Sequence, residues 1–328
     1  MAKKVKVNVE EVAKQRAEIA QAFADKAIKN TYDFVMYFDV KDGNPNGDPD
    51  AFNVPRTDIE TNVGLVTPVC LKYKVRRAVE LFTQYAPEKY APQTNRILVQ
   101  EGTRLNTRFE EAYAALGFPV TQKKKSDSEN MEDVETGENA LRIPVANKYM
   151  CDNYFDVRTF GALMSTGDAP CGRTKGPVSF SYARSVEPVV IQDVKLTRCV
   201  RTKDDDKEGG MFANHQMIPY ALYKVTGHID GCLAQNSGFS EEDLALLVEA
   251  MKTMFAHDRS SVRGEMHVRK FVMFKHETLW GNADYDKLFD LVQAKRNAAV
   301  EVAREFKDYT ITIDETGIPA GVTHEVIV

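Results

Sequence analysis

The sequence has no hydrophobic run that approaches the length needed to span a membrane, although 43% of its 328 residues are apolar. The lysines near its start are not followed by the apolar segment of a signal peptide. The sequence also lacks any C-x-x-C pair, and this argues against a zinc knuckle or a disulfide framework. We therefore expect a cytoplasmic protein whose scattered cysteines are reduced core thiols, namely Cys70, Cys151, Cys171, Cys199 and Cys232.

Signatures of catalysis are missing as well. The six histidines are dispersed, and the chain contains neither an H-E-x-x-H pair nor a G-x-S-x-G nucleophile motif. The overall composition is that of an ordinary folded protein with a large core. We therefore expect no catalytic residue, no bound metal and no cofactor.

A large excess of either charge is absent too. The formal net charge is −5, but residues 127–138 contain six acids and no base. Outside this segment, 43 basic residues face 42 acidic ones, so the rest of the chain is close to neutral. Net charge therefore neither favours nor excludes a polyanionic partner, and local patches of charge must decide.

What the sequence does contain is a succession of strand and helix patterns. Apolar residues at helical spacing predict an amphipathic helix over residues 9–29, and YDFVMYFDV at 32–40 predicts a central strand. Thr67 and Pro68 are suited to be the N-cap and first-turn proline of a helix that continues through LKYKVRRAVELF. Residues 86–150 are irregular, and we expect them to form an insertion that is partly helical.

The second half of the chain is richer in strand patterns. The β-runs at 189–200 and 216–229 flank a long charged segment, which predicts a protruding hairpin arm. The order of the predicted elements is β-α-β-β-α-β, as in ferredoxin-like and RRM folds, so we expect an α+β protein. The other elements expected here are strands at 177–186, 269–277 and 309–313, a helix after a capping box at Ser240, and a helix at about 284–296.

The stretch FDVKDGNPNGDPD at residues 38–50 follows the first strand with a stiff, polar, turn-prone loop. Its first half fits an EF-hand calcium loop, but position twelve would be Asn53 instead of a glutamate, and a strand precedes it where a helix should. Asp48 and Asp50 also suggest an acidic catalytic cluster, although no histidine or lysine base is nearby in sequence. A structural turn and a polar lip that holds a ligand are the other interpretations.

The stretch GDAPCGRT at residues 167–174 resembles a phosphate-binding P-loop. Arg173 replaces the lysine that this loop requires, and a strand follows it instead of a helix, so nucleotide hydrolysis is not expected. The glycines fit a flexible or close-approach loop. Arg173 and Lys175 can still contact a backbone phosphate.

Four cations follow closely after the predicted N-cap: Lys72, Lys74, Arg76 and Arg77. Positive side chains and free backbone N–H groups near one helix N-terminus are what polyphosphate binding requires. A solvated basic flank of an ordinary helix is the alternative. Apolar residues beside a cation, as in Arg158, Phe160 and Met164, similarly indicate either base stacking or core packing.

The combination of these motifs is more specific than any one of them. FDVKDGNPNGDPD is followed by PRTDIETNVGLVTPVCLKYKVRR, DVRTFGALM, GPVSFSYARSVEP, IPYALY, HDRSSVRGEM and KFVMFKH. Together they closely resemble the backbone subunit of the type I-C CRISPR surveillance complex, Cascade. The resemblance covers residues 32–313, and the N-terminal helix, the insertion and the tail are less well matched.

The resemblance implies a hand-shaped protein. An N-terminal helical extension, residues 1–30, would precede a single RRM-like palm domain, residues 31–328, with helical fingers inserted at 86–150 and a β-hairpin thumb at 189–229. Copies would assemble head to tail along one CRISPR RNA, and each thumb would displace a nucleotide at regular intervals. The bases between would pair with target DNA, so the protein itself would read only shape and phosphate.

The implied partners are the CRISPR RNA, the target DNA strand and further copies of the chain. Other Cascade subunits would be neighbours, namely the subunit that binds the RNA 5′ handle, the large subunit and the small subunit, with the recruited nuclease-helicase reached indirectly. The implied role is non-catalytic. The alternative is a metal-dependent RNA endonuclease, because backbone relatives in type III complexes cut target RNA with an acidic loop residue, and Asp48 and Asp50 lie in a loop here.

The resemblance also suggests RNA contacts residue by residue. The asparagines of the polar loop would meet ribose and phosphate, and the basic helix would neutralise phosphates. Either Phe160 or Met164 would be the apolar wedge under the displaced base. The full set of expected RNA-binding residues is Asn44, Asn46, Arg56, Thr67, Lys72, Lys74, Arg76, Arg77, Arg158, Phe160, Met164, Arg173, Lys175 and, in the thumb, Arg198, Phe212 and His215.

Overall fold

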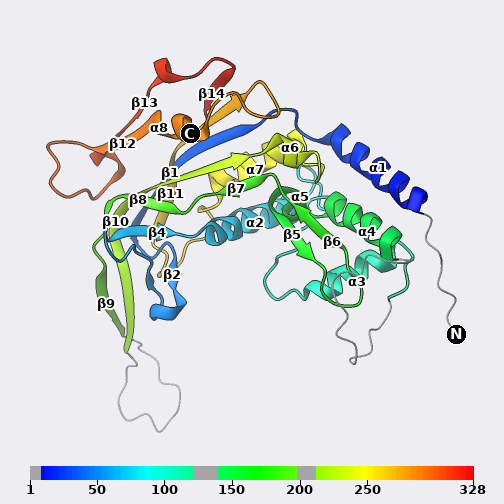
Figure 1. The fold of residues 1–328 in the computed structure, drawn as a ribbon. Helices are drawn as coiled ribbons and strands as arrows, with labels where there is room; N and C mark the ends of the chain where they lie inside the picture. The colour runs from blue at the N-terminus through cyan, green and yellow to red at the C-terminus, as the bar shows by residue number, and fades with distance from the viewer. Residues whose placement is uncertain (1–8, 121–138, 198–211) are drawn as a thin grey trace, which may run out of the picture.

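The computed structural model describes residues 9–120, 139–197 and 212–328 of the chain. At its centre, eight strands of these residues form an antiparallel sheet in the order β14-β11-β1-β10-β8-β4, with β7 and β9 also paired to β10 (Figure 1). The strands are β1 Tyr32–Gly43, β4 Val63–Val66, β7 Val178–Phe180, β8 Ala183–Pro188, β9 Gln192–Thr197, β10 Phe212–Ile229, β11 Glu265–His276 and β14 Val322–Val326.

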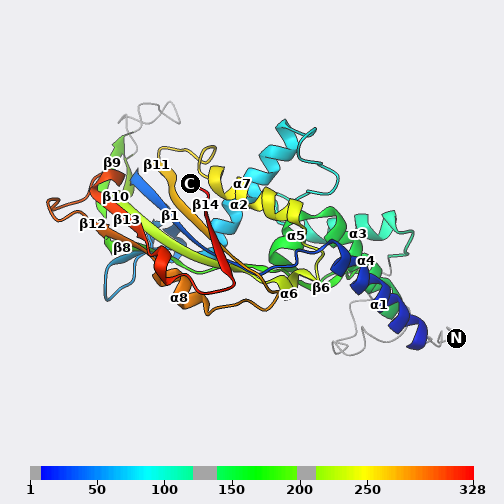
Figure 2. The same cartoon turned by 90° about the horizontal axis from the view of Figure 1, so that it is seen from above.

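Two long helices cover one face of this sheet, α2 Pro68–Tyr85 and α7 Glu241–Thr253 (Figure 2). Alternate residues of β1 point toward them, so Phe34 and Phe38 share a fully buried core with Leu71 and Leu247 of the helices. The core of the sheet and its two helices comprise six elements, which occur along the chain in the order β1, α2, β7, β10, α7 and β11, with other elements between them. In the sheet, the four strands lie side by side as β11-β1-β10-β7. This is the ferredoxin-like arrangement, so the predicted element order and the α+β class are confirmed.

The opposite face of the sheet is covered by a C-terminal layer, which consists of α8 Tyr285–Asp290 and the hairpin of β12 Val292–Arg296 with β13 Tyr309–Ile313. Tyr37 of β1 points into this second core and donates a hydrogen bond to the Val292 carbonyl at 3.0 Å. The strand predicted at 309–313 is confirmed. The helix predicted at 284–296 is wrong in its second half, because Val292 begins an alternating buried and exposed pattern that pairs with β13.

A second group of helices packs beside one end of the sheet (Figure 1). Phe109, Tyr113 and Tyr154 are buried in its core, together with the free thiols of Cys151 and Cys171. The predicted N-terminal helix and the helical content of 86–150 are confirmed for the residues that the structure describes, which exclude the acidic run. The elements are α1 Val9–Lys26, α3 Leu105–Ala115, α4 Asn139–Asn153, α5 Phe155–Phe160, β5 Gly161–Met164 and β6 Gly172–Lys175.

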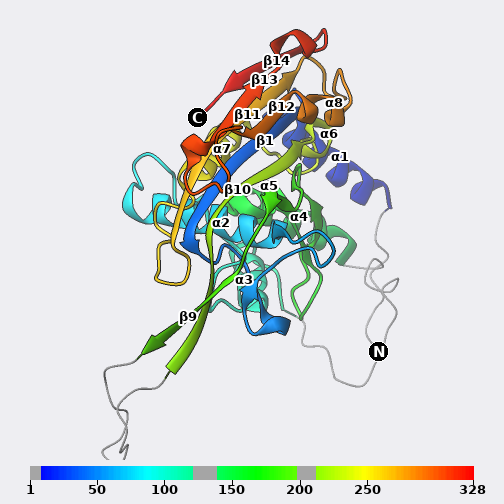
Figure 3. The ribbon, with the colours of Figure 1, turned by 90° about the vertical axis from the view of Figure 1, so that its left-hand side faces the viewer.

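The strands β9 and β10 form a hairpin that extends away from the sheet (Figure 3). Its described rungs run from Gln192 opposite Met217 to Thr197 opposite Phe212, so the two predicted strands are confirmed, and residues 198–211 lie outside the described ranges. None of the helices within those ranges is both long enough and apolar enough to cross a membrane. The remaining short elements are β2 Gly47–Asp48, β3 Val54–Pro55, α6 Gly231–Ala234 and the 3-10 turns η1 Pro49–Ala51, η3 Phe306–Asp308 and η4 Glu315–Gly317.

Candidate nucleic-acid interface

The polar loop that follows β1 is held in shape by its own asparagines. The Asn44 backbone N–H donates to the Val262 carbonyl at 2.8 Å, and the Asn44 side-chain amide donates to the Asn53 carbonyl at 2.7 Å. The side-chain oxygen of Asn46 accepts the Thr67 N–H at 2.9 Å. The side chains of Asn44 and Asn46, both predicted to contact RNA, therefore already bind backbone groups of the protein. Asn44 is also almost completely buried.

Two glycines allow this loop to lie directly against the segment that joins α7 to β11, residues 257–264. A Cβ atom on Gly43 would collide with the Arg263 carbonyl, and a Cβ atom on Gly264 would collide with the Lys41 carbonyl. Gly264 also has a φ of +65°, which residues with side chains rarely adopt. The end of β1 and a segment more than 200 positions away are thereby in backbone contact.

The loop, the 257–264 segment and the first turns of α2 enclose a cleft of about 860 Å³. Cations and aromatic rings line it together, with Arg56 and Arg263 beside Tyr73 and Tyr182. The Asn44 Oδ1 and the Arg56 Nε are buried there without a hydrogen-bond partner among the described residues. A groove that combines positive charge, aromatic faces and unused polar atoms has the composition of a single-strand nucleic-acid site.

Thr67 caps α2, as predicted. Its hydroxyl oxygen accepts the Cys70 N–H at 3.2 Å, and Pro68 occupies the first turn. The hydroxyl is therefore already used to satisfy the helix. Because Thr67 and Pro68 line the cleft, the N-terminus of α2 and its partial positive charge lie at the cleft wall.

Lys74 is buried, so we withdraw it from the expected RNA contacts. Its ammonium group is completely removed from solvent and forms an ion pair with Asp258, which also pairs with Arg263 at 3.1 Å. Helical spacing explains this position. Lys74 follows the core residue Leu71 by three places and precedes the core residue Ala78 by four, so it lies on the buried face of α2.

Arg76 and Arg77 reach the surface region of α2, but each is paired with a carboxylate. The Arg76 Nε donates to the buried Asp156 at 2.9 Å, and Arg77 pairs with Glu80 at 2.6 Å. The Asp156 carboxylate also accepts the backbone N–H groups of residues 98 and 99. Much of the positive charge predicted for this helix is therefore neutralised within the protein.

Lys72 is different, because no carboxylate lies within ion-pair distance of it among the described residues. Its Nζ atom lies 5.0 Å from the centre of the Phe160 ring, and the Arg76 guanidinium carbon lies 5.1 Å from the same point. Burial, and next the charge of Arg76, lower the pKa of Lys72 below its usual range. An amine held on an aromatic face without a counter-ion is well placed to interact with an added phosphate.

Arg158 has a structural role, so it too is withdrawn from the expected contacts. It is only 7% exposed and donates to both oxygens of Asp243, at 3.0 and 2.7 Å, and to the carbonyls of Thr94 and Cys151. These bonds tie α5 to the N-terminus of α7. A guanidinium whose donors already have this many internal acceptors is not available to phosphate.

The β5–β6 hairpin buries Met164, one of the two residues expected as the wedge, and exposes its neighbour Leu163. Met164 is completely buried in the second core and is not an exposed wedge, whereas Leu163 is 64% exposed. Leu163 lies opposite Arg173, and Gly161 lies opposite Lys175, so the outer face carries an apolar side chain near two exposed cations. Alternation along a strand is the reason, because successive side chains point to opposite faces.

The acidic residues of the polar loop have local partners. The Asp48 side chain caps the η1 turn by accepting the Asp50 N–H at 3.2 Å, and it pairs with Arg56 at 3.4 Å. Within the described ranges, no group of three or more histidine, cysteine or acidic side chains is arranged to hold a metal ion. These contacts favour the structural-turn interpretation of Asp48 over a catalytic one.

The predicted contacts of the arm are only partly described. Arg198 and the side chain of Phe212 lie outside the described ranges, although Phe212 begins β10. His215 is half-buried, and its Nε2 has no hydrogen-bond partner in the part of the chain that is described.

The structure therefore separates the predicted residues into groups. Asn44, Asn46, Arg56 and Thr67 meet at the cleft, and Lys72, Arg76 and Phe160 form a second cluster farther along α2. Sequence reasoning did not single out five further residues. These are Tyr73, Leu163, Tyr182, Ser260 and Arg263. Helical spacing from the N-cap could have indicated Tyr73, and Ser260 and Arg263 belong to the HDRSSVRGEM motif.

Known proteins resemble this chain in sequence. A model of the family described as CRISPR-associated protein Cas7 matches residues 30–314. The CRISPR-associated protein Cas7 of Haloferax volcanii is 25% identical over 307 residues, which cover 87% of this chain and 81% of that protein. A chain of a solved CRISPR RNA-guided surveillance complex, pre-nicking, has a TM-score of 0.44 and 14% identity, covering 74% of this chain and 78% of its own. A second such complex gives a TM-score of 0.39, 13% identity and coverage of 74% and 68%.

Proposed function

The chain belongs to the Cas7 family of CRISPR-associated proteins, and from this premise we propose that it binds CRISPR RNA as a backbone subunit of a surveillance complex. The motifs in the sequence make type I-C the proposed subtype. In this role the protein holds the RNA through phosphate and ribose, leaves the spacer bases exposed for pairing with target DNA, and cuts neither strand. Copies of the chain and the other subunits of the complex are its proposed protein partners.

The observation that carries this proposal is the cleft at the capped N-terminus of α2. Arg56 and Arg263 lie at its wall, and with Lys74 they face only the two carboxylates of Asp48 and Asp258, so this group keeps a net positive charge. Tyr73 and Tyr182 provide faces on which bases or sugars can stack. Positive charge engages phosphate, and an aromatic face accepts the ring of any base. Contacts of this kind suit a subunit that must hold any guide sequence.

Lys72 adds a second positive site on α2. Because its charge has no carboxylate partner among the described residues, it is the helix cation that gains most from an added phosphate. We assign the apolar wedge to Leu163, with Arg173 and Lys175 as phosphate contacts beside it. The β9–β10 arm, with His215 on it, would fold over the strand as the thumb.

Binding of the full-length chain to single-stranded RNA over a range of salt concentrations tests the proposal. We expect Lys72→Glu to weaken the affinity at least tenfold at low salt and to reduce the salt slope by about one. Lys295→Glu is the matched control, because Lys295 is an exposed cation of β12 in the layer on the opposite face of the sheet. A wild-type chain with no affinity for single-stranded RNA in dilute buffer would contradict the proposal.

A further inference from the structure

The hairpin of β2 and β3 carries the most exposed large apolar side chain among the described residues, Phe52, which is 98% exposed. Phe52 lies between η1 and β3. The hairpin projects in the same direction as the β9–β10 arm (Figures 1 and 3). Exposure alone does not show a role, because single apolar residues are common on protein surfaces. The backbone of Phe52 and its surroundings provide the further evidence.

The backbone at Phe52 has a conformation that a bulky residue rarely adopts. Its φ is +52°, and the φ of the next residue, Asn53, is +62°. Asparagine tolerates this left-handed region and glycine favours it, but a phenylalanine there is strained. The chain therefore holds an aromatic ring at a position where glycine would fold more easily. Strain of this kind indicates that the ring itself has a use.

Hydrogen bonds fix the tip of this hairpin, residues 49–53. The Asn53 N–H donates to the Asp48 carbonyl at 2.7 Å, and the Asp48 side chain accepts the Asp50 N–H at 3.2 Å. From outside the hairpin, the Asn44 side-chain amide donates to the Asn53 carbonyl at 2.7 Å. A ring that is presented on a pre-formed turn requires little ordering of the backbone when it binds, and this favours association.

The tip is continuous with the candidate RNA cleft. Pro49 and Asn53, which precede and follow Phe52 in the sequence, both line the cleft. Consecutive Cα atoms are about 3.8 Å apart, so Phe52 lies at the cleft rim. Tyr73 and Tyr182 line the same cleft. Single-strand nucleic-acid sites combine several aromatic rings in this way, each as a platform for a base.

The charges around the cleft favour a base, and not a phosphate, at Phe52. Residues 47–55 contain two acids and no base, and the Asp50 side chain is exposed at the tip. The cations Arg56 and Arg263 lie instead in the cleft wall. A phosphate is therefore attracted to the wall and repelled by the tip. The uncharged base is the part of the nucleotide that can face the ring.

We propose that Phe52 stacks on a base of the single strand whose phosphates occupy the cleft. The proposal rests on the function proposed above and adds to it a contact with a base at the cleft rim. Every base has a flat aromatic face, so the contact does not depend on the guide sequence. A base inside a duplex has its faces covered by its neighbours, and the contact therefore favours an unpaired strand.

Two strands of equal length test the proposal with the full-length chain: an ordinary single-stranded RNA, and a strand built from stable abasic units that keeps the phosphates. We expect Phe52→Ala to weaken binding of the ordinary RNA about fivefold or more, with an unchanged salt slope. Binding of the abasic strand should be the same in the variant and the wild type. Phe52→Trp should retain the wild-type affinity, whereas Phe52→Leu, which is apolar without an aromatic face, should not.

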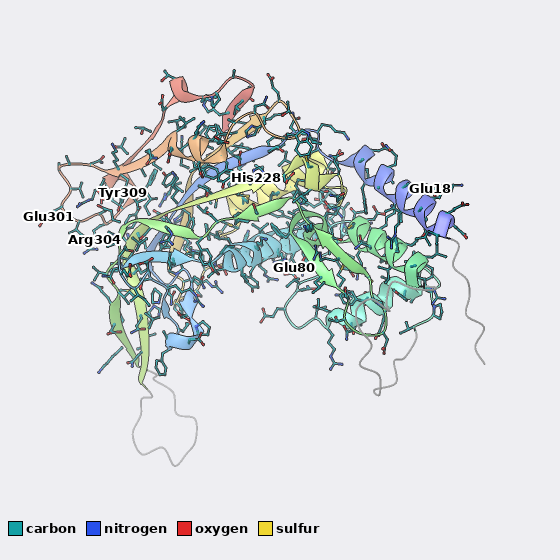
Figure 4. The ribbon with its side chains drawn as sticks, in the orientation of Figure 1. Glu18, Glu80, His228, Glu301, Arg304 and Tyr309 are labelled. Carbon is teal, nitrogen blue, oxygen red and sulfur yellow. The ribbon has the colours of Figure 1, made fainter. Side chains whose placement is uncertain are left out.

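Tyr85→Ala is the matched control, because Tyr85 is an exposed aromatic residue at the other end of α2 from the cleft. It follows Glu80, which lies away from the β2–β3 hairpin in Figure 4. We expect this variant to bind both strands as the wild type does.

The strain at Phe52 gives an independent measurement. Phe52→Gly removes the ring and suits the left-handed backbone, so its melting temperature should be no lower than that of the wild type, while its RNA affinity falls as in Phe52→Ala. This result would show that the loss of binding is not a loss of folding.

Fluorescence reports the contact directly. Trp280 is the only tryptophan of the chain, so Phe52→Trp combined with Trp280→Phe places a single indole at the cleft rim. The ordinary RNA should quench its emission, and the abasic strand should not.

Equal affinity of Phe52→Ala and the wild type for the ordinary RNA would overturn the proposed stacking and indicate that the ring meets a protein partner. Equal losses on the ordinary and abasic strands, or wild-type affinity in Phe52→Leu, would overturn it as well. Failure of the wild type to bind the ordinary RNA would instead overturn the proposed function itself.

Discussion

The side chains of Lys74 and Asp258 form an ion pair in which the lysine is completely removed from solvent. The pair joins α2 to the 257–264 segment, which is one wall of the candidate RNA cleft. A buried ion pair adds little net stability compared with apolar residues of similar size, but it specifies which groups must meet. The pair thus sets the position of Arg263 relative to the N-terminus of α2.

Removal of one member of this pair should destabilise the fold. Lys74→Ala leaves the Asp258 carboxylate in a largely buried position with Arg263 as its remaining partner, and we expect a loss of about 3 kcal/mol in the free energy of unfolding. The double variant Lys74→Met with Asp258→Leu should be clearly more stable than Lys74→Ala. Urea denaturation measures both, with Lys295→Ala as an exposed control that should change by less than about 0.5 kcal/mol. Equal losses in Lys74→Ala and Lys295→Ala would argue against the buried pair.

The histidines around Asp33 predict a pH dependence of stability. Asp33 accepts hydrogen bonds from His228 Nδ1 at 2.7 Å and His276 Nε2 at 2.8 Å. Burial tends to raise the pKa of Asp33, but these bonds and the histidine charges lower it below the ordinary 3.8. The hydrogen bond to Asp33 is the main reason that the pKa of His228 is raised above the ordinary 6.5.

The two shifts define a window of pH. Stabilisation from His228 is complete below pH 6.5 and is lost as the pH rises through its higher folded pKa. Stabilisation from Asp33 is present above pH 3.8 and is lost as the pH falls through its lower folded pKa. We expect His228→Gln to reduce the decline in unfolding free energy between about pH 6 and pH 9, measured by urea denaturation at several pH values. An identical decline in the variant and the wild type would show that His228 does not carry this dependence.

Met164 and Leu163 should respond oppositely to truncation. Met164→Ala opens a cavity in the second core, and we expect it to cost about 2 to 5 kcal/mol of stability. Leu163→Ala should cost less than about 1 kcal/mol because its side chain is mostly exposed, but it should weaken RNA binding if Leu163 is the wedge. Thermal denaturation and RNA titration of both variants make the comparison. A fully stable Met164→Ala variant would contradict the strand register described here.

The endonuclease alternative makes a prediction that differs from ours. We expect the protein, assembled on a guide RNA, to leave a complementary RNA intact in the presence of Mg²⁺, and Asp48→Ala to behave in the same way. The Asp48 side chain caps a turn and pairs with Arg56, so its loss should cost about 1 kcal/mol of stability instead. Regularly spaced cleavage that disappears in Asp48→Ala would establish the enzyme and refute the non-catalytic role.

Much of the fold is predictable because its signals are local. The apolar run of β1 and the capped, periodic helix α2 each carry their own pattern, and their order points to the ferredoxin-like sheet. Spacing could also have placed Lys74 in the core, three residues after Leu71. The β5 strand is different, because its four residues are too few for periodicity to show that Leu163, and not Met164, faces outward.

The candidate site is less predictable because it depends on residues that are distant in sequence. Arg158 is buried and forms an ion pair with Asp243, which lies 85 positions away in the sequence. No local pattern around either residue indicates this pairing. In the same way, the position of Arg263 beside Arg56 follows from the contact of two loops at the ends of β1 and β11. Sequence motifs identify the lysines and arginines of this protein. Only the folded structure shows which of these side chains lack a carboxylate partner.

The close approach of Gly43 and Gly264 has a mechanical consequence. Backbone touches backbone there, so the 257–264 segment cannot move toward the end of β1 without pressing on it, and β10 and β11 flank this strand. A ligand that fills the cleft and pushes this segment inward would therefore strain the middle of the sheet. Amide hydrogens of β1 that touch no ligand would then report whether the cleft is occupied, through their rate of exchange with solvent.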